Sequence, residues 1–356
     1  MEIRQLQNQL RTLIELDETE SPIVSYFLDL EDPDGSRIVR EQILAARKAV
    51  TPDQRAALDR TIDRIDHHVP WKLDESTRSV AVFARSGSSP LFVVMEFEAT
   101  LPTRLVVEST PAVFPLIELK DNYHRYVLMV CNEDSARVME VSLGSVTQEI
   151  WARRPELRKR VGREWTKLHY QNHRRDRNER FIKEKIALVE RILASGGHTH
   201  LMLAGNPRVL AQVRKSLPKR LANKLVDVIP AAARDRSSDI VVSTLSSFIE
   251  HEERESVASV HLLQRELRRG GLAVCGYGES REALERGQAD QLIILADRDE
   301  THAERREELV KLALQQDVPV EVVQHSEELV ELGCVGCLLR YETRAPVMAA
   351  VAQEAA

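Results

Sequence analysis

Residues 271–295, with the sequence GLAVCGYGESREALERGQADQLIIL, decide the fold of the C-terminal third of the chain. The stretch reads as a short apolar strand, a glycine turn, a helix and a second apolar strand. The same order continues through a helix at 301–316 and a strand at 319–323 to a last strand, CVGCLLRY, at 334–341. Near-continuous apolar strands that alternate with helices indicate a mostly parallel or mixed sheet with helices on both faces.

Two further α/β units precede this one. Segment 1–110 has a strand-like run at 23–30, two helical stretches and three β-rich runs separated by turn residues. Segment 111–236 begins with a meander of three strands between 126 and 150, and a helix is clear from Asn178 onward. We therefore expect an α/β chain of three domains, each a mixed sheet with helices. The predicted domains span 1–110, 111–236 and 238–345, with a tail at 346–356.

The composition is that of a folded protein outside the membrane. Of the 356 residues, 43% are hydrophobic and 30% are charged, and a chain of this length exceeds one ordinary core. Charges occur in every turn of the N-terminal segment, so no signal peptide is predicted. The longest apolar runs, 292–296 and 345–352, are far shorter than a membrane span. Four cysteines do not make a disulfide scaffold in a chain of this size. We expect a cytoplasmic protein.

One segment carries a charge opposite to that of the rest of the chain. Residues 151–185 contain 13 Lys and Arg against 5 Asp and Glu, a net charge of +8, whereas the whole chain carries −6. Such a density of positive charge attracts a phosphate backbone. The segment also holds Trp165, His169, Tyr170 and His173, flat side chains that can stack on unpaired bases. Structured RNA is therefore the favoured partner.

Other interpretations of the basic segment explain less of it. A solvated helix face accounts for the charge but not for the interleaved aromatic residues. A membrane-surface helix needs an apolar face, and residues 164–178 offer only Trp165, Leu168 and Tyr170. Duplex DNA is usually read by a helix-turn-helix or a zinc finger, and neither pattern is present. Because no apolar stripe extends upstream of Asn178, a helix there must project from the body or contact a polar partner.

The sequence has no motif of a self-contained active site. GxSxG, P-loop and HExxH patterns are absent. Cys334 and Cys337 have the spacing of a metal knuckle but no second ligand pair, so we predict a glycine-containing core strand there. His198, His200 and His251 are predicted to lie in loops or on the surface. We therefore expect no metal site, no cofactor and no motif-borne catalytic residue.

The order of parts resembles the class-one peptide chain release factors of archaea and eukaryotes and their relative Pelota, including the bacterial branch with hibernation factors of the Balon type. Residues 271–295 look like the family's glycine turn, helix and apolar strand. The run LGCVGCLLRY at 332–341 resembles its closing Gly-Gly-Ile-Gly-x-Leu-Arg-Tyr strand. A strand meander, a basic loop and a long helix follow one another in 111–236 as they do in the family. The resemblance implies a ribonuclease-H-like second domain and a third domain similar to ribosomal protein L7Ae.

One departure from the family bears on the function. Release factors carry Gly-Gly-Gln in the loop before the long helix, where it positions a water on the peptidyl-tRNA ester. The corresponding stretch here is VGREWTKLHYQNH, 161–173, with the single glycine Gly162 and the glutamine Gln171. Without two glycines the backbone cannot easily take the positive-φ turn that brings it close to an ester. We therefore expect a protein that is not an enzyme.

The resemblance implies a ribosome-binding translation factor that occupies the tRNA A site of idle or stalled ribosomes without cleaving peptidyl-tRNA. It further implies that the first domain approaches the decoding centre and that the acidic third domain docks a translational GTPase of the elongation factor Tu type. The basic segment is expected to contact ribosomal RNA through Arg158, Lys159, Arg160, Arg163, Trp165, Lys167, His169, Tyr170, Arg174, Arg175 and Arg177.

Two enzymatic alternatives remain open. A rescue factor for stalled ribosomes would hydrolyse peptidyl-tRNA through Gln171 or His169, near the loop tip. A nuclease on a ribonuclease-H-like domain needs carboxylates that hold Mg²⁺, and the strands of the second segment supply Glu140 but few others. Peptide release from stalled ribosomes distinguishes the first alternative from binding alone. Metal-independent binding without cleavage disposes of the second.

Overall fold

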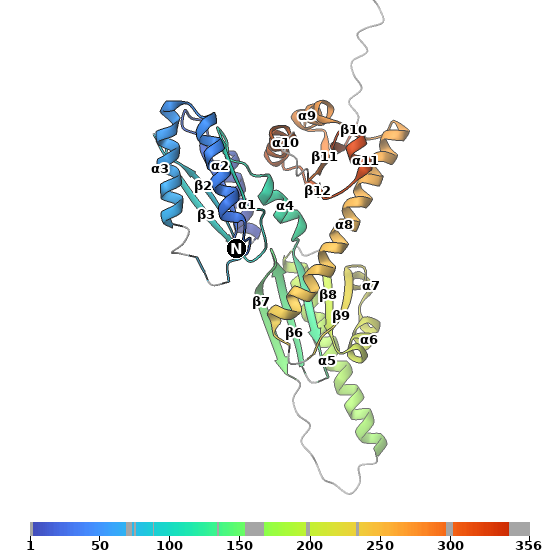
Figure 1. Cartoon of the computed structure of the whole chain (residues 1–356). Helices are drawn as coiled ribbons and strands as arrows, with labels where there is room; N and C mark the ends of the chain where they lie inside the picture. Colours follow the sequence, from blue (N-terminus) through green and yellow to red (C-terminus); the bar gives the residue numbers. More distant parts are fainter. Residues whose placement is uncertain are drawn as a thin grey trace, which may run out of the picture.

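The computed structural model describes residues 3–341, except 69–72, 75, 88, 134, 154–166, 197–199, 233–234 and 297–301. These residues form a four-stranded N-terminal sheet, a five-stranded central sheet and a four-stranded C-terminal sheet. Helices cover each sheet, and in Figure 1 the N- and C-terminal units lie beside each other above the central unit. The α/β class expected from the sequence is confirmed.

The N-terminal unit is an antiparallel sheet between two pairs of helices. Its elements are α1 (Ile3–Ile14), β1 (Ile23–Asp29), α2 (Gly35–Ala49), α3 (Pro52–His68), β2 (Ser79–Arg85), β3 (Leu91–Phe97), β4 (Arg104–Glu108) and α4 (Phe114–Asn122). The strand order is β3-β2-β1-β4, and every pair is antiparallel. Because side chains alternate along a strand, Phe27 packs with α1 and α4, whereas Tyr26 packs with α2 and α3. The mixed sheet expected here is therefore corrected to an antiparallel one.

The central unit is a mixed sheet covered on both faces. Its elements are β5 (Tyr126–Cys131), β6 (Ser135–Ser142), β7 (Ser145–Arg153), α5 (Lys167–Gly196), β8 (His200–Gly205), α6 (Pro207–Ser216), α7 (Lys219–Ala222) and β9 (Leu225–Pro230). The strand order is β7-β6-β5-β8-β9, with β5, β8 and β9 parallel. Ile186 of α5 and Val213 of α6 pack on one face. The first half of α8 (Ser237–Arg269) packs on the other through Ile240 and Phe248.

The C-terminal unit is also a mixed sheet with helices on both faces, as the alternation of apolar strands and helices predicts. Its elements are β10 (Ala273–Cys275), α9 (Tyr277–Glu285), β11 (Ala289–Leu295), α10 (Ala303–Gln315), β12 (Val320–Val323), α11 (Glu327–Glu331) and β13 (Val335–Leu339). In the order β10-β13-β11-β12, β11 and β12 are parallel and the other pairs are antiparallel. Val260 and Leu263, in the second half of α8, pack on this sheet. The long helix α8 therefore serves both units (Figure 1).

The short helix α4 joins the three units. At its start, the backbone N–H groups of Val113 and Phe114 donate to the buried carboxylate of Glu307 in α10. Near its end, Asp121 accepts a hydrogen bond of 2.6 Å from the backbone N–H of Val322 in β12. The N- and C-terminal units share one apolar cluster that includes Leu10 of α1 and α4 itself. The chain then passes directly from α4 into β5 of the central sheet.

Three short helices, α4, α7 and α11, were not expected from the sequence. Six of the nine residues of α4 are buried, so the segment lacks the apolar stripe by which a surface helix is recognised. α7 and α11 contain only four and five residues, too few for a helical period to be visible.

In the part of the chain that the structure describes, no helix has both the length and the apolar character needed to cross a membrane.

Candidate functional site

Four strands of the central unit finish at the same edge of its sheet. β5, β8 and β9 run parallel, and β7 runs in the same direction because two antiparallel pairings separate it from β5. The chain leaves β7 at Arg153, and α5 begins at Lys167. The carboxyl edge of an open α/β sheet is where such folds usually place their ligands. Figure 1 shows the first half of α5 extending beyond this edge.

The projecting part of α5 is separated in sequence from the part that packs on the sheet. Apolar contacts with the central core begin at Phe181 and continue through Ile182, Ile186 and Leu193. Phe181 is the fourteenth residue after Lys167, which corresponds to about 21 Å of helix. We call Lys167–Asn178 the projecting helix. It has the backbone of a regular α-helix although the sequence gives it no apolar stripe.

The structure distributes the predicted RNA contacts over two parts of the chain. Arg158, Lys159, Arg160, Arg163 and Trp165 lie outside the described residues. The projecting helix carries the others, which are Lys167, His169, Tyr170, Arg174, Arg175 and Arg177, together with Gln171 of the enzymatic alternative. At a spacing of three or four residues, the backbone positions 167, 170, 174 and 177 occupy one stripe of this helix. The helix therefore brings together positions that the sequence suggested only as a run.

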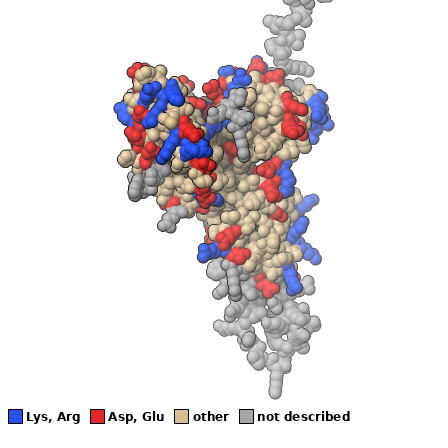
Figure 2. Space-filling model, in the orientation of Figure 1, with Lys and Arg blue, Asp and Glu red and all other residues tan. Residues whose placement is uncertain are grey.

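A second basic surface on the same unit was missed in the sequence. Residues 206–226, which form α6, α7 and the start of β9, contain six Lys and Arg and no Asp or Glu. We call this surface the α6–α7 patch, and its exposed members are Arg208, Arg214, Lys215, Lys219 and Arg220. Figure 2 shows Lys and Arg along the right-hand edge of the central unit, over α6 and α7. The patch was missed because buried apolar residues lie between its charged residues in the sequence. The absence of any acidic residue over this stretch was the signal that could have revealed it.

The α6–α7 patch adjoins α5. Arg220 forms an ion pair with Glu190 of α5. Val209 and Val213 of α6 lie in the same apolar cluster as Ile186 of α5. The patch and the packed half of α5 thus lie on the same face of the sheet, and the projecting helix continues from that half (Figure 1).

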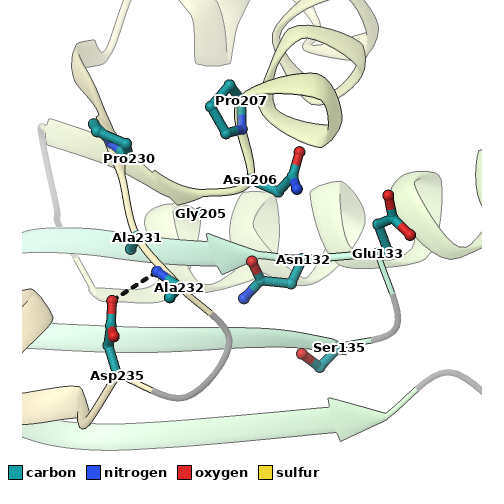
Figure 3. A pocket seen from close by; sticks show the side chains of 10 residues that line it. All are labelled: Asn132, Glu133, Ser135, Gly205, Asn206, Pro207, Pro230, Ala231, Ala232 and Asp235. Atoms are coloured by element: carbon teal, nitrogen blue, oxygen red, sulfur yellow. Dashed lines mark hydrogen bonds between the residues drawn. The ribbon is translucent and has the colours of Figure 1, made fainter.

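A pocket of about 590 Å³ lies at the carboxyl edge itself (Figure 3). Its walls come from the ends of β5, β8 and β9 and from the start of α6, where Asn206 caps the helix and Pro207 is its first residue. Gly205 has a φ of 134°, and a Cβ there would lie 1.9 Å from the carbonyl oxygen of Cys131. Only glycine therefore lets β8 turn into α6 so close to β5.

The lining of this pocket does not suit an anion or a covalent reaction. Glu133 and Asp235 supply carboxylates, Asn132 and Asn206 supply amides, and the described lining contains no Lys, Arg, His or Cys. Asp235 accepts a hydrogen bond of 2.6 Å from the backbone N–H of Ala232, drawn as the dashed line in Figure 3. A phosphate would be repelled here by the two carboxylates. The positive charge of this edge lies on the helices, not in the pocket.

The structure also places the residues of three other sequence expectations. Glu140, the one carboxylate offered for a nuclease, pairs with Arg125 at 2.8 Å. Among the described residues, no metal-ligating group of three forms around Glu140. Cys337 is buried within β13 and Cys334 lies just before it, as predicted for a core strand. The expectation of loop or surface histidines is wrong for His200 and His251, because His200 begins β8, His251 lies in α8, and the two converge with acidic groups of α8.

Comparison with known proteins supports the expected resemblance in the central part of the chain. Residues 111–248 match the model of the family described as bacterial archaeo-eukaryotic release factor family 10. No curated protein matches the sequence. The family match confirms the predicted resemblance to the release factor and Pelota family for this region.

Several solved structures are similar over most of the chain at low identity. The archaeal translation termination factor aRF1 is 17% identical, with 96% of this chain and 99% of that chain covered and a TM-score of 0.29. Pelota of Archaeoglobus fulgidus is 14% identical, with 96% and 93% covered and a TM-score of 0.37. An archaeal Pelota, from a model of ribosome-bound Pelota and ABCE1, is 16% identical, with 95% of each chain covered and a TM-score of 0.46.

Proposed function

We propose that this release-factor-like chain is a ribosome-associated translation factor that contacts ribosomal RNA through the projecting helix. The position of the basic segment in the chain is the observation that supports this proposal. It lies within the region that matches the release factor family, follows the last strand of the meander, and continues as a helix that leaves the body. A helix without an apolar stripe gains no stability by packing on the core of its own chain. Its charge and aromatic residues suit a phosphate-rich partner.

The α6–α7 patch extends this surface with side chains whose exposure is known. Arg214, Lys215 and Lys219 are exposed, and no acidic residue follows Glu190 until Asp227. Basic groups so arranged attract phosphates, although a single pair with Glu190 neutralises Arg220. We infer that the patch contacts the phosphate backbone beside the groove entered by the projecting helix.

The chemistry of the loop favours occupancy of the A site over peptide release. The sequence contains no Gly-Gly-Gln, and the stretch before the projecting helix carries Arg163, Glu164 and Trp165 after Gly162. Bulky charged residues hinder the close backbone approach that an ester requires. We propose that the protein holds idle ribosomes, as a hibernation factor does, and is not a hydrolase. Rescue through Gln171 is the second candidate, because this glutamine lies on the projecting helix.

The acidic C-terminal unit suits a protein partner. Residues 238–341 contain 21 Asp and Glu against 11 Lys and Arg, a net charge of −10. This charge repels RNA, so the unit is expected to face away from it. Dom34, a yeast relative with a similar structure, is described as interacting with Hbs1. We propose that the C-terminal unit docks a translational GTPase of the elongation factor Tu type and that the first unit approaches the decoding centre.

Charge reversal of the α6–α7 patch tests the RNA contact. The variant Arg214→Glu/Lys215→Glu/Lys219→Glu is expected to reduce co-sedimentation with purified bacterial ribosomes. Each lost phosphate contact also makes the dependence on salt shallower, by about 0.9 in the logarithmic slope. The matched control is Arg265→Glu/Arg268→Glu/Arg269→Glu at the end of α8, which reverses the same number of charges on the acidic unit. Equal binding of both variants would contradict a role for the patch.

Peptide release distinguishes the two candidate functions. Stalled ribosome complexes that carry labelled peptidyl-tRNA are incubated with the protein, and the released peptide is measured. A hibernation factor binds without release, so only background hydrolysis is expected. Release that Gln171→Ala abolishes, while binding is retained, would establish the rescue function in its place.

A further inference from the structure

The opposite end of the central sheet holds a cluster of histidines and carboxylates that the proposed function does not use. His200 is the first residue of β8, and His124 lies two residues before the start of β5, the strand that pairs with β8. The two rings stack at 6.4 Å. His251 and Glu255 approach from α8, where this helix passes from the central sheet to the C-terminal one. The cluster therefore joins three segments that are distant in sequence.

The donor atoms of three of these residues converge on one point. His251 and Glu255 stand one helical turn apart, and Nε2 of His251 lies 3.3 Å from Oε1 of Glu255. Nε2 of His200 lies 3.8 Å from Oε2 of Glu255. One ligand atom from each residue falls within 4.8 Å of the others. Ligands about 2.0–2.1 Å from a tetrahedral ion are about 3.3 Å apart, so small side-chain rotations complete the geometry.

A buried carboxylate is directed into the same space. Glu252 is 8% exposed, and its Oε2 lies 2.6 Å from Nδ1 of His124. Its Oε1 has no hydrogen-bond partner in the part of the chain that the structure describes and lies 3.7 Å from Nε2 of His200. A buried carboxylate oxygen without a donor is costly unless a cation or a proton satisfies it. It lies beside the group of three, next to His200, and a side-chain rotation would bring it to an ion bound there.

The geometry points to a binding site for a divalent transition metal ion of the zinc type, held by His200, His251 and Glu255 with Oε1 of Glu252 in the fourth position. Two imidazoles and two carboxylates are a donor set that zinc accepts, whereas magnesium and calcium prefer oxygen ligands alone. His124 would orient Glu252 from outside, as carboxylates and histidines around metal sites usually do.

The surroundings of the cluster are compatible with metal binding. The side chain of Glu255 is 57% exposed and that of His251 is 28% exposed, so an ion can enter from solvent. A bound ion would fasten α8 to the start of β8, at the place where the helix leaves the central sheet for the C-terminal unit.

The test is a titration of the tag-free, metal-depleted full-length protein. Zn²⁺ binding is followed by calorimetry, and Co²⁺ binding by the visible absorption of tetrahedral cobalt. We expect one ion per chain. His251→Gln and Glu255→Gln each remove a ligand from a partly exposed position, and each is expected to weaken binding by about 100-fold or more. Circular dichroism checks that both variants remain folded.

Control variants show whether the loss of metal binding is specific to the proposed ligands. His261→Gln and Glu253→Gln change the same residue types at exposed positions of α8 outside the donor set, and both should bind as the wild type does. Cys275→Ser/Cys334→Ser should also bind normally, which separates the site from the partly exposed thiols. The proposal is overturned by the lack of saturable binding, by binding that survives both ligand substitutions, or by binding lost only in the cysteine variant.

Discussion

At the scale of single residues, Gly336 shows how a spacing that suggests metal chemistry can serve packing. It lies between Val335 and Cys337 in β13, with its backbone against α8 and β10. A Cβ at this position would lie 2.6 Å from Leu263 Cδ2 and 2.9 Å from the carbonyl oxygen of Val274. The glycine therefore sets the distance between the long helix and the C-terminal sheet, and packing explains its place between the two cysteines of this stretch.

We predict that Gly336→Ala lowers the stability of the C-terminal unit by about 1–3 kcal/mol, because the added methyl overpacks a rigid contact. Thermal unfolding measures the effect. Gly278→Ala is the matched control, since Gly278 lies in α9 with no atom near the position of an added Cβ, so alanine should be neutral or slightly stabilising there. Equal stabilities of the two variants would show that the contact is not tight.

The four thiols differ in reactivity for a related reason. Burial raises the pKa of Cys131 and of Cys337 to about 12 each, so at pH 8 only about one molecule in 10⁴ carries either thiolate. Cys275 and Cys334 are partly exposed. We predict that a disulfide reagent at pH 8 modifies two thiols in the native protein and four after unfolding in guanidinium. Rapid modification of a third thiol in the native state would contradict this burial pattern.

At the scale of elements, the helices that the sequence predicted were those with a visible stripe. The spacing of Ile182, Ile186 and Leu193 predicted the packed half of α5, and the loss of the stripe predicted the half that leaves the body. α4 was missed because it is buried nearly all round. Its fixed position depends on Glu307, about 190 residues away, and no local pattern reveals such a partner.

We predict that Glu307→Ala destabilises the junction of the three units by about 2 kcal/mol or more. The substitution leaves the backbone N–H groups of Val113 and Phe114 buried without an acceptor, and each unsatisfied group costs about 1–3 kcal/mol. Glu304→Ala, at an exposed position in the first turn of the same helix, should cost only a few tenths of a kcal/mol. Thermal unfolding of the two variants compares them, and similar losses would argue against the assigned role of Glu307.

At the scale of the whole molecule, the features that the sequence predicted were those with consecutive charges or a continuous apolar pattern. Continuous apolar runs predicted the strands because burial needs them, and the +8 segment stood out because its charges are consecutive. The α6–α7 patch and the histidine cluster were not foreseen. Their members are interleaved with core residues or lie about 50 residues apart, as His200 and His251 do. Only the folded chain assembles them.

The two ends of the central sheet consequently have different characters. The projecting helix brings positive charge to the carboxyl edge, and the α6–α7 patch, where Arg214 and Lys215 are exposed, covers the side of the sheet between its two edges (Figure 1). The amino edge adjoins the acidic C-terminal unit and holds the carboxylates around His200. The proposed function predicts that the carboxyl edge faces RNA and that the acidic C-terminal unit faces a protein partner.

The most direct test is co-sedimentation of the full-length protein with purified bacterial ribosomes at 50 and 200 mM salt. If about seven phosphates are contacted, affinity should fall by about 6 × 10³-fold between these conditions. Arg174→Glu/Arg175→Glu/Arg177→Glu should bind weakly even at low salt, whereas the control Arg265→Glu/Arg268→Glu/Arg269→Glu should bind as the wild type does. Unchanged binding of the first variant, with a salt dependence equal to that of the wild type, would contradict the claim that the projecting helix contacts ribosomal RNA.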